Sequence, residues 1–132
     1  MTIFDKDDVI KSKYNLERTF IMKDDVIFIT DGKRLTACLL CEIDDHAARR
    51  LRERIDERLA VIRPSVLTLD FSGVRFMDSS GIALILGRRE AAQAQGAALE
   101  LKGLSPTLKK LIRLAGLDRL ENISILSSGR RI

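Results

Sequence analysis

Apolar and polar positions along the chain alternate in blocks whose spacing predicts strands and helices in turn. Short runs rich in β-branched and aromatic residues, such as 26–30 and 66–71, are typical of strands. Between such runs, apolar residues recur every three or four positions, which indicates amphipathic helices. The pattern predicts strands over 26–30, 35–43, 66–71, 97–101 and 123–126, and helices over 45–63, 80–95 and 105–116.

Turn and cap residues support these boundaries. Asp31-Gly32 is a favoured hairpin turn, so the first two strands are expected to pair antiparallel. Asp44 or Asp45 can cap the first helix, because a short carboxylate accepts hydrogen bonds from free backbone N–H groups. Ser105 and Pro106 fit the cap and first position of the last helix.

The apolar stripes predict which helix faces are buried. On the first helix the expected stripe is Ala48, Leu51, Ile55, Leu59 and Ile62. On the second helix it is Ile82, Ile85, Leu86 and the stem of Arg89, with Gly96 ending the helix.

Strands and helices alternate from residue 35 onward, which favours β-α-β units with parallel pairing and right-handed crossovers. We therefore expect one α/β domain with a mixed, mostly parallel sheet of about four to five strands and helices packed on it. A chain of 132 residues suits a single domain. Residues 1–24 show no clear periodicity and form an N-terminal extension of unknown role, so the domain is expected over 25–132.

The net charge of +4 hints at an anionic partner. The densest basic stretch, 49–58, mixes its arginines with acidic residues, so it suits either an ordinary charged helix surface or DNA binding. The chain has no tryptophan and one tyrosine, so base stacking is poorly provided for and direct nucleic-acid binding is not expected.

The chain has no membrane or secretion signal in its apolar pattern. No apolar run reaches the roughly 20 residues of a membrane span. The first eight residues lack the apolar stretch of a secretory signal. A cytoplasmic protein without a membrane span is expected.

Cys38 and Cys41 have a spacing that suits redox chemistry, half a zinc site or core packing. Both fall in the predicted strand over 35–43, where residues three apart point to opposite faces and could not share one metal ion. Since there is no second cysteine pair, the sequence favours core packing and predicts no metal site and no cofactor.

Enzyme signatures are missing from the sequence. His46 is the single histidine, no serine lies in a G-x-S-x-G elbow, and neither a G-x-x-x-x-G-K-[ST] loop nor a G-x-G-x-x-G fingerprint occurs. A receiver-type aspartyl site would need a lysine after the last strand, and none follows 123–126. We therefore expect a non-enzymatic protein.

Functional loops of a parallel α/β sheet lie beyond the carboxyl ends of its strands, here 42–46 and 76–81. The second loop places Asp78, Ser79 and Ser80 where a helix begins. A helix N-terminus offers free N–H groups and a partial positive charge, so a phosphate on Ser79 would be stabilised there. The same residues also suit simple helix capping, and local pattern alone leaves both interpretations open.

The two loops also carry a family resemblance. Segment 76–81, Phe-Met-Asp-Ser-Ser-Gly, followed by Gly-Arg at 87–88, resembles the phosphorylation segment of STAS-domain anti-sigma factor antagonists of the stage II sporulation protein AA type. Segment 42–47 and the region 104–117 are similar to further parts of that family. The resemblance covers about residues 25–126, and the combination of motifs is specific.

The resemblance implies a partner-switching regulator. In its unphosphorylated form such an antagonist binds an anti-sigma factor that is also a GHKL-type serine kinase, and so releases the sigma factor. The kinase phosphorylates the first serine of the segment, here Ser79, and a PP2C-type phosphatase reverses the modification. Asp44, Asp78, Ser80 and Gly81 are the partner-binding positions that the resemblance implies.

One departure and one alternative accompany this interpretation. Family members usually carry another helix after the last strand, but about six residues follow Leu126, too few for a stable helix. The domain is therefore expected to lack it. The same domain type also serves as a non-catalytic scaffold in stress-signalling assemblies or as an accessory subunit of lipid transporters, which is the alternative function.

Overall fold

The computed structural model of the protein describes residues 25–127. The expected N-terminal extension therefore lies outside the described residues. The elements follow in the order β1 (Val26–Asp31), β2 (Arg34–Leu39), α2 (Asp45–Ile62), β3 (Val66–Asp70), α3 (Ser79–Ala94), β4 (Ala98–Lys102), α4 (Pro106–Leu114), a 3₁₀ turn η1 (Leu117–Arg119) and β5 (Ile123–Ile125).

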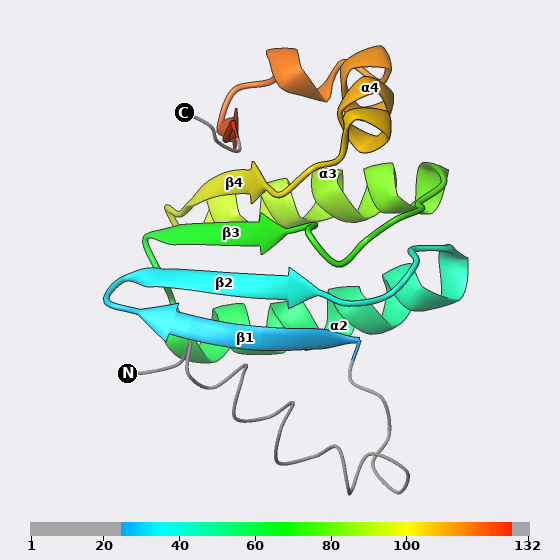
Figure 1. Cartoon of the computed structure of the whole chain (residues 1–132). Coiled ribbons are helices and arrows are strands. Elements are labelled where there is room, and N and C mark those ends of the chain that lie inside the picture. The colour runs from blue at the N-terminus through cyan, green and yellow to red at the C-terminus, as the bar shows by residue number, and fades with distance from the viewer. Residues whose placement is uncertain (1–24, 128–132) are drawn as a thin grey trace, which may run out of the picture.

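The five strands form one mixed sheet in the order β1-β2-β3-β4-β5. The β1 strand is antiparallel to β2, and every other neighbouring pair is parallel. Figure 1 shows α2 and α3 side by side along one face of the sheet, with α4 beyond the carboxyl end of β4. The α/β class, the mixed sheet and the alternation of strands and helices are confirmed.

Several element boundaries that were predicted from local sequence signals are confirmed. The hairpin turns at Gly32, whose φ of +63° is readily adopted by glycine. Ser105 caps α4 by accepting a hydrogen bond from the N–H of Leu108 at 3.1 Å, and Pro106 is the first helical residue. These features depend on a few neighbouring residues, which is why the sequence predicts them.

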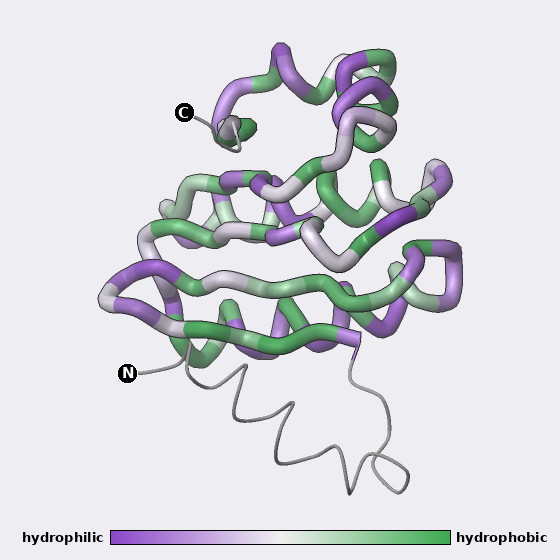
Figure 2. Tube along the Cα trace, in the orientation of Figure 1, coloured by the Kyte–Doolittle hydropathy of each residue, from purple (hydrophilic) through white to green (hydrophobic). Residues whose placement is uncertain are grey.

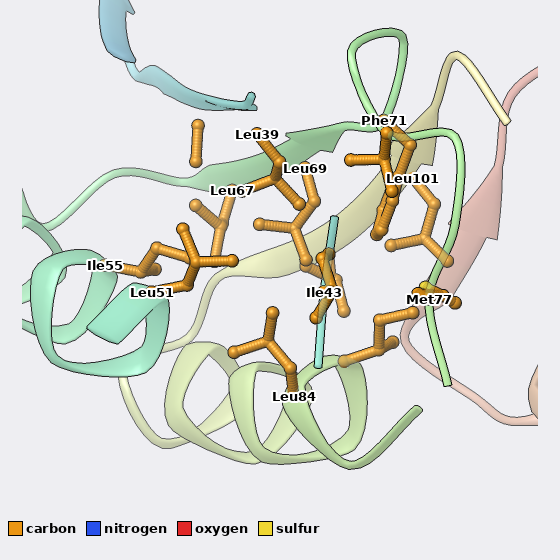
Figure 3. Close-up of a cluster of buried hydrophobic side chains, with 14 of the residues drawn as sticks. Leu39, Ile43, Leu51, Ile55, Leu67, Leu69, Phe71, Met77, Leu84 and Leu101 are labelled. Carbon is orange, nitrogen blue, oxygen red and sulfur yellow. The ribbon is translucent and has the colours of Figure 1, made fainter. Parts of the chain in front are cut away.

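The core lies between the sheet and the pair α2 and α3 (Figure 3). Apolar side chains of β2, β3 and β4 point to this face, and they meet the stripe of α2 together with residues of α3. Fully or almost fully buried members are Leu35, Leu39, Leu51, Ile55, Leu59, Leu67, Leu69, Ile85, Leu99 and Leu101. Figure 2 shows the corresponding pattern, with mostly apolar central strands and helices whose residues change between apolar and polar within each turn.

The opposite face of the sheet carries a polar cluster at its centre. Arg34 donates a hydrogen bond to Thr68 Oγ1 at 2.9 Å and forms an ion pair with Glu100. Thr68 in turn donates to Glu100 Oε1 at 3.1 Å. The two faces therefore differ in chemistry, and the apolar face is the one the helices cover.

The second strand is shorter than the predicted 35–43, because it ends at Leu39. Cys41 consequently lies in the following loop, not in the strand, and Ile43 returns to pairing only as an isolated bridge to Met77. Cys38 and Cys41 are both of intermediate exposure. Burial, followed by the charge of Asp25, raises the pKa of the Cys41 thiol to about 11, so this thiol stays protonated at neutral pH.

The buried face follows the prediction on α2 and is rotated on α3. On α2 the predicted Leu51, Ile55 and Leu59 are buried together with Ala47, while Ala48 and Ile62 are half-buried. On α3 the buried residues are Gly81, Leu84, Ile85, Arg88 and Ala92, so the buried arginine is Arg88 and not Arg89. Arg89 instead donates to the carbonyl of Glu121 at 2.7 Å. Among the described residues, no helix is both long and apolar enough to cross a membrane.

Candidate functional site

Two loops meet at the carboxyl ends of β2 and β3. The N–H of Ile43 donates to the carbonyl of Phe76 at 3.0 Å, and the N–H of Asp78 donates to the carbonyl of Ile43 at 3.2 Å. Ile43 and Met77 thereby form an isolated parallel bridge. Because α2 begins just after Ile43 and α3 just after Asp78, the bridge holds the N-termini of these two helices next to each other.

Asp78 is the N-cap of α3 and has extended backbone angles. Its Oδ1 accepts a hydrogen bond from the N–H of Ser80 at 2.7 Å, which satisfies one of the free donors of the first turn. Ser79 is the first residue of the helix and is exposed. Within residues 25–127 its hydroxyl makes no hydrogen bond, so it is accessible for chemistry.

The residues that flank this serine anchor the start of α3. Met77 is 4% exposed and Gly81 is buried. A Cβ atom at Gly81 would lie 2.6 Å from the sulfur of Met77, closer than real Cβ contacts. The glycine therefore allows the helix to start directly against Met77, while Ser79 faces outward.

Asp44 is the corresponding cap of α2 and is exposed. Its Oδ1 accepts a hydrogen bond from the N–H of Ala47 at 2.9 Å. That hydrogen bond is the main cause that lowers the pKa of Asp44, and the nearby His46 acts in the same direction. Asp44 is therefore ionised at neutral pH and presents a carboxylate beside the start of α3.

The sequence-predicted site residues divide into an exposed and a buried group. Asp44, Asp78 and Ser79 are exposed, Ser80 is half-buried, and Gly81 is buried. The bridge between the two loops brings the exposed residues to one end of the sheet. Gly81 has no side chain to offer a partner and contributes packing against Met77 instead.

Two features of this end of the molecule were not predicted from the sequence. Phe76 is 52% exposed beside the site, although its type favours burial. Arg88 is buried between α2 and α3, where its Nε lies 3.1 Å from Asp56 Oδ1. The three- and four-residue steps from Gly81 through Leu84 and Ile85 to Arg88 are the signal that could have placed this arginine on the inner face.

Comparison with known sequences identifies the domain type. The model of the STAS domain family matches residues 39–125. An anti-sigma F factor antagonist of Lysinibacillus sphaericus is 36% identical over 81 residues, covering 60% of this chain and 68% of that protein. An anti-sigma-B factor antagonist of Bacillus subtilis is 32% identical over 88 residues, covering 67% and 79%.

Comparison with solved structures agrees at the level of the fold. The unphosphorylated form of the anti-sigma factor antagonist SpoIIAA superposes with a TM-score of 0.61 at 23% identity, covering 79% of this chain and 89% of that chain. An anti-sigma factor antagonist from Mycobacterium paratuberculosis gives a TM-score of 0.66 at 21% identity, covering 79% and 90%. The chain therefore belongs to the STAS domain family, and anti-sigma factor antagonists are among its relatives.

Proposed function

We propose that the protein is an anti-sigma factor antagonist that is switched by phosphorylation of Ser79. In its unphosphorylated form it binds an anti-sigma factor with serine kinase activity and so releases a sigma factor. Transfer of a phosphate to Ser79 ends that binding, and a phosphatase of the PP2C type restores it. The domain itself is a binding module without catalytic activity.

One observation supports this proposal above the others. Ser79 presents a free hydroxyl at the first position of a helix of 16 residues, and Met77 and Gly81, two positions away on either side, are buried. A kinase can reach the hydroxyl without unfolding the domain. The helix N-terminus then stabilises the added charge through its free N–H groups and its dipole.

The surroundings of Ser79 explain how the modification would weaken binding. Phosphoserine adds roughly −1.5 to −2 charges near neutral pH. Asp44 and Asp78 place two exposed carboxylates beside Ser79, so a partner that contacts them is expected to present basic groups or donors there. A new dianion in the interface that meets carboxylates or loses water unpaired would cost about 1–3 kcal/mol of binding free energy.

The direct test is phosphorylation in vitro. The protein is incubated with the anti-sigma factor kinase of its own organism and ATP, and the phosphate is located by mass spectrometry. We expect modification of the wild type and of Ser80→Ala, and none of Ser79→Ala. Ser80→Ala is the matched control because it removes a hydroxyl from the neighbouring position of the same helix.

Binding to the same kinase completes the test. Ser79→Ala is expected to bind it like the unmodified wild type, while the phosphorylated wild type binds roughly tenfold to more than a hundredfold more weakly. Phosphate found on Ser80 in Ser79→Ala at the normal level would show that the site is assigned to the wrong serine.

A scaffold role is the second candidate. The RsbT co-antagonist protein RsbRD of Bacillus subtilis is 31% identical to this chain over 90 residues, an identity close to that of the antagonists. The matched region covers only 32% of RsbRD. Size-exclusion chromatography with light scattering separates the two functions. A scaffold would form a large assembly without the kinase, whereas a switch protein would form a small complex that phosphorylation dissolves.

A further inference from the structure

A groove of about 460 Å³ runs between α2 and α3 and begins at the site described above. Asp45 and Ser80, in the first turns of the two helices, line its near end. Arg52 and Arg88 line its far end, and Gly87 lies between. The groove is therefore continuous with the exposed surface that carries Asp44 and Ser79.

On the α3 side of the groove, Gly87 has no side chain to fill the space. A Cβ atom built at Gly87 would meet no atom within 4 Å, so no contact inside the domain requires glycine there. Glycine in a helix interior destabilises it by about 1 kcal/mol relative to alanine. The missing side chain keeps space free above α3, and nothing in the described part of the chain fills that space.

The charges along the groove are mainly positive. Arg49 and Arg52 are exposed on α2, and Arg88 lies 95% buried on α3 at its edge. Arg49 pairs with Asp45 at 3.2 Å, an exposed pair that holds little energy. Arg52 has no ion pair among residues 25–127.

Arg88 is paired with Asp56 but keeps donors that make no hydrogen bond within residues 25–127. Its Nε lies 3.1 Å from Asp56 Oδ1, but neither its Nε nor its Nη1 makes a hydrogen bond of good geometry within the described residues. Burial is the main cause that lowers the pKa of Arg88; the charge of Arg52 acts in the same direction, while the charges of Asp56 and Glu90 oppose it. A buried guanidinium beside a second cation is stabilised by any additional anion that reaches it.

We propose that the groove between α2 and α3 accepts an acidic segment of the protein that binds the Ser79 surface, with a carboxylate held between Arg52 and Arg88. The proposal rests on the proposed function, because it assumes a protein partner at the adjoining surface. It extends that function by a second contact, in which acidic groups of the partner bind the arginines of the groove. The carboxylates Asp44 and Asp78 lie beside Ser79, whereas three arginines line the groove.

The shape of the groove favours a peptide segment over a small ligand. It lies between two helices, and its lining combines small residues such as Ala83 and Gly87 with the arginines Arg49, Arg52 and Arg88. Such a groove can receive backbone along its length and one acidic side chain at its basic end. Arginine suits this task because its planar donors match a carboxylate.

Affinity for the purified anti-sigma factor kinase tests the proposal. Arg52→Glu reverses the charge of the groove, and Gly87→Leu fills its free space. We expect each variant to bind roughly tenfold or more weakly than the wild type, through like-charge repulsion and lost access. Arg54→Glu and Ala94→Leu, exposed substitutions on the same helices away from the groove, are the matched controls and keep wild-type affinity. Thermal unfolding of every variant confirms that it is folded.

Zero-length cross-linking identifies the chemistry of the occupant. Arg52→Lys introduces an amine, which a carbodiimide can couple to a carboxyl group within contact distance. We expect a cross-link to an aspartate or glutamate of the kinase, found by mass spectrometry, and none with Arg54→Lys.

The outcomes separate this proposal from the proposed function. If the wild type binds the kinase and both groove variants bind equally well, the groove proposal is wrong and the switch at Ser79 stands. If the wild type does not bind the kinase at all, both the groove proposal and the proposed function are wrong. If ATP alone stabilises the wild type but not Arg52→Glu, and the groove variants keep full affinity for the kinase, the groove binds a small phosphate compound and the proposal is overturned.

Discussion

Single residues decide the geometry at the start of α3. Met77 packs into the core, Asp78 caps the first turn, and Gly81 leaves room for the methionine sulfur. Ser79 is exposed because its neighbours on both sides are committed to packing or capping. The position of the hydroxyl is therefore fixed by contacts inside the domain.

Gly81→Ala tests the packing part of this argument. The added methyl group would lie 2.6 Å from the sulfur of Met77 and 3.0 Å from its Cβ and Cγ, so the methionine or the helix must shift. We expect a loss of about 1–3 kcal/mol in the free energy of unfolding, measured by urea denaturation. Gly87→Ala on the same helix meets no neighbour and is expected to stabilise by about 0.5–1 kcal/mol. Equal effects of the two substitutions would contradict the role given to Met77.

The cap of α2 predicts a dependence on pH. The hydrogen bond from Ala47 lowers the pKa of Asp44 below its ordinary value of 3.8. The ionised form therefore stabilises the folded state above that pH, and this contribution is lost as the pH falls through the lowered pKa. Asp44→Asn keeps a capping oxygen but cannot titrate. We compare the free energies of unfolding of the wild type and Asp44→Asn by urea denaturation from neutral pH to strong acid. Any excess stability of the wild type is expected to shrink as the pH falls below about 3.8. An advantage that grows as the pH falls would exclude this assignment.

At the scale of elements, α2 and α3 are joined by apolar packing and by one partly buried ion pair. Arg88 contributes the side chain that is 6% exposed, and Asp56 the one that is 44% exposed. Such a pair adds little net stability, because taking the guanidinium out of water offsets most of the attraction. Removing only the carboxylate is different, since it leaves the buried charge alone.

Asp56→Asn should therefore lower the free energy of unfolding more than Arg88→Met does. We expect a loss of about 1–2 kcal/mol for Asp56→Asn, a value reduced by the solvent exposure of the carboxylate. Arg88→Met exchanges the charge for an apolar side chain of similar length and should change stability by less than about 1 kcal/mol. Chemical denaturation of both single variants and the double variant measures the coupling, and a larger loss for Arg88→Met would show that the arginine contributes through packing.

The sequence predicts most elements of this fold because their signals are local. The turn at Gly32, the cap at Ser105 and the stripe of α2 around Leu51 and Ile55 each depend on residues a few positions apart. The proposal for Ser79 rests on the same kind of local signal, its place at a helix start, together with the family motif around it.

The features missed from the sequence depend on distant contacts. The end of β2 at Leu39 and the bridge from Ile43 to Met77 follow from how two loops pack, which residue patterns do not encode. The sequence placed the stem of Arg89 on the inner face of α3, whereas Arg88 is the buried arginine and a carboxylate from α2 reaches it. The groove could not be predicted at all, since it exists only once α2 and α3 lie side by side.

For the whole molecule, the proposed switch requires a change of charge and no change of fold. Phosphate at the N-terminus of α3 interacts favourably with the helix dipole, by about 0.3–1 kcal/mol for an exposed negative charge. We expect phosphorylated protein to unfold at the same temperature as the unmodified form or slightly above it, while its affinity for the kinase falls. Thermal unfolding of both forms measures this, and a clear loss of stability on phosphorylation would point to a conformational mechanism.

The bridge between Ile43 and Met77 affects the rate of partner binding and the conformational entropy that binding costs. Both helix starts are tied to one another by main-chain hydrogen bonds before any partner arrives. A binding protein therefore meets a surface that is already assembled and pays little conformational entropy to complete it. Recognition can then approach a rigid-body encounter, in which a single added phosphate is enough to spoil the fit.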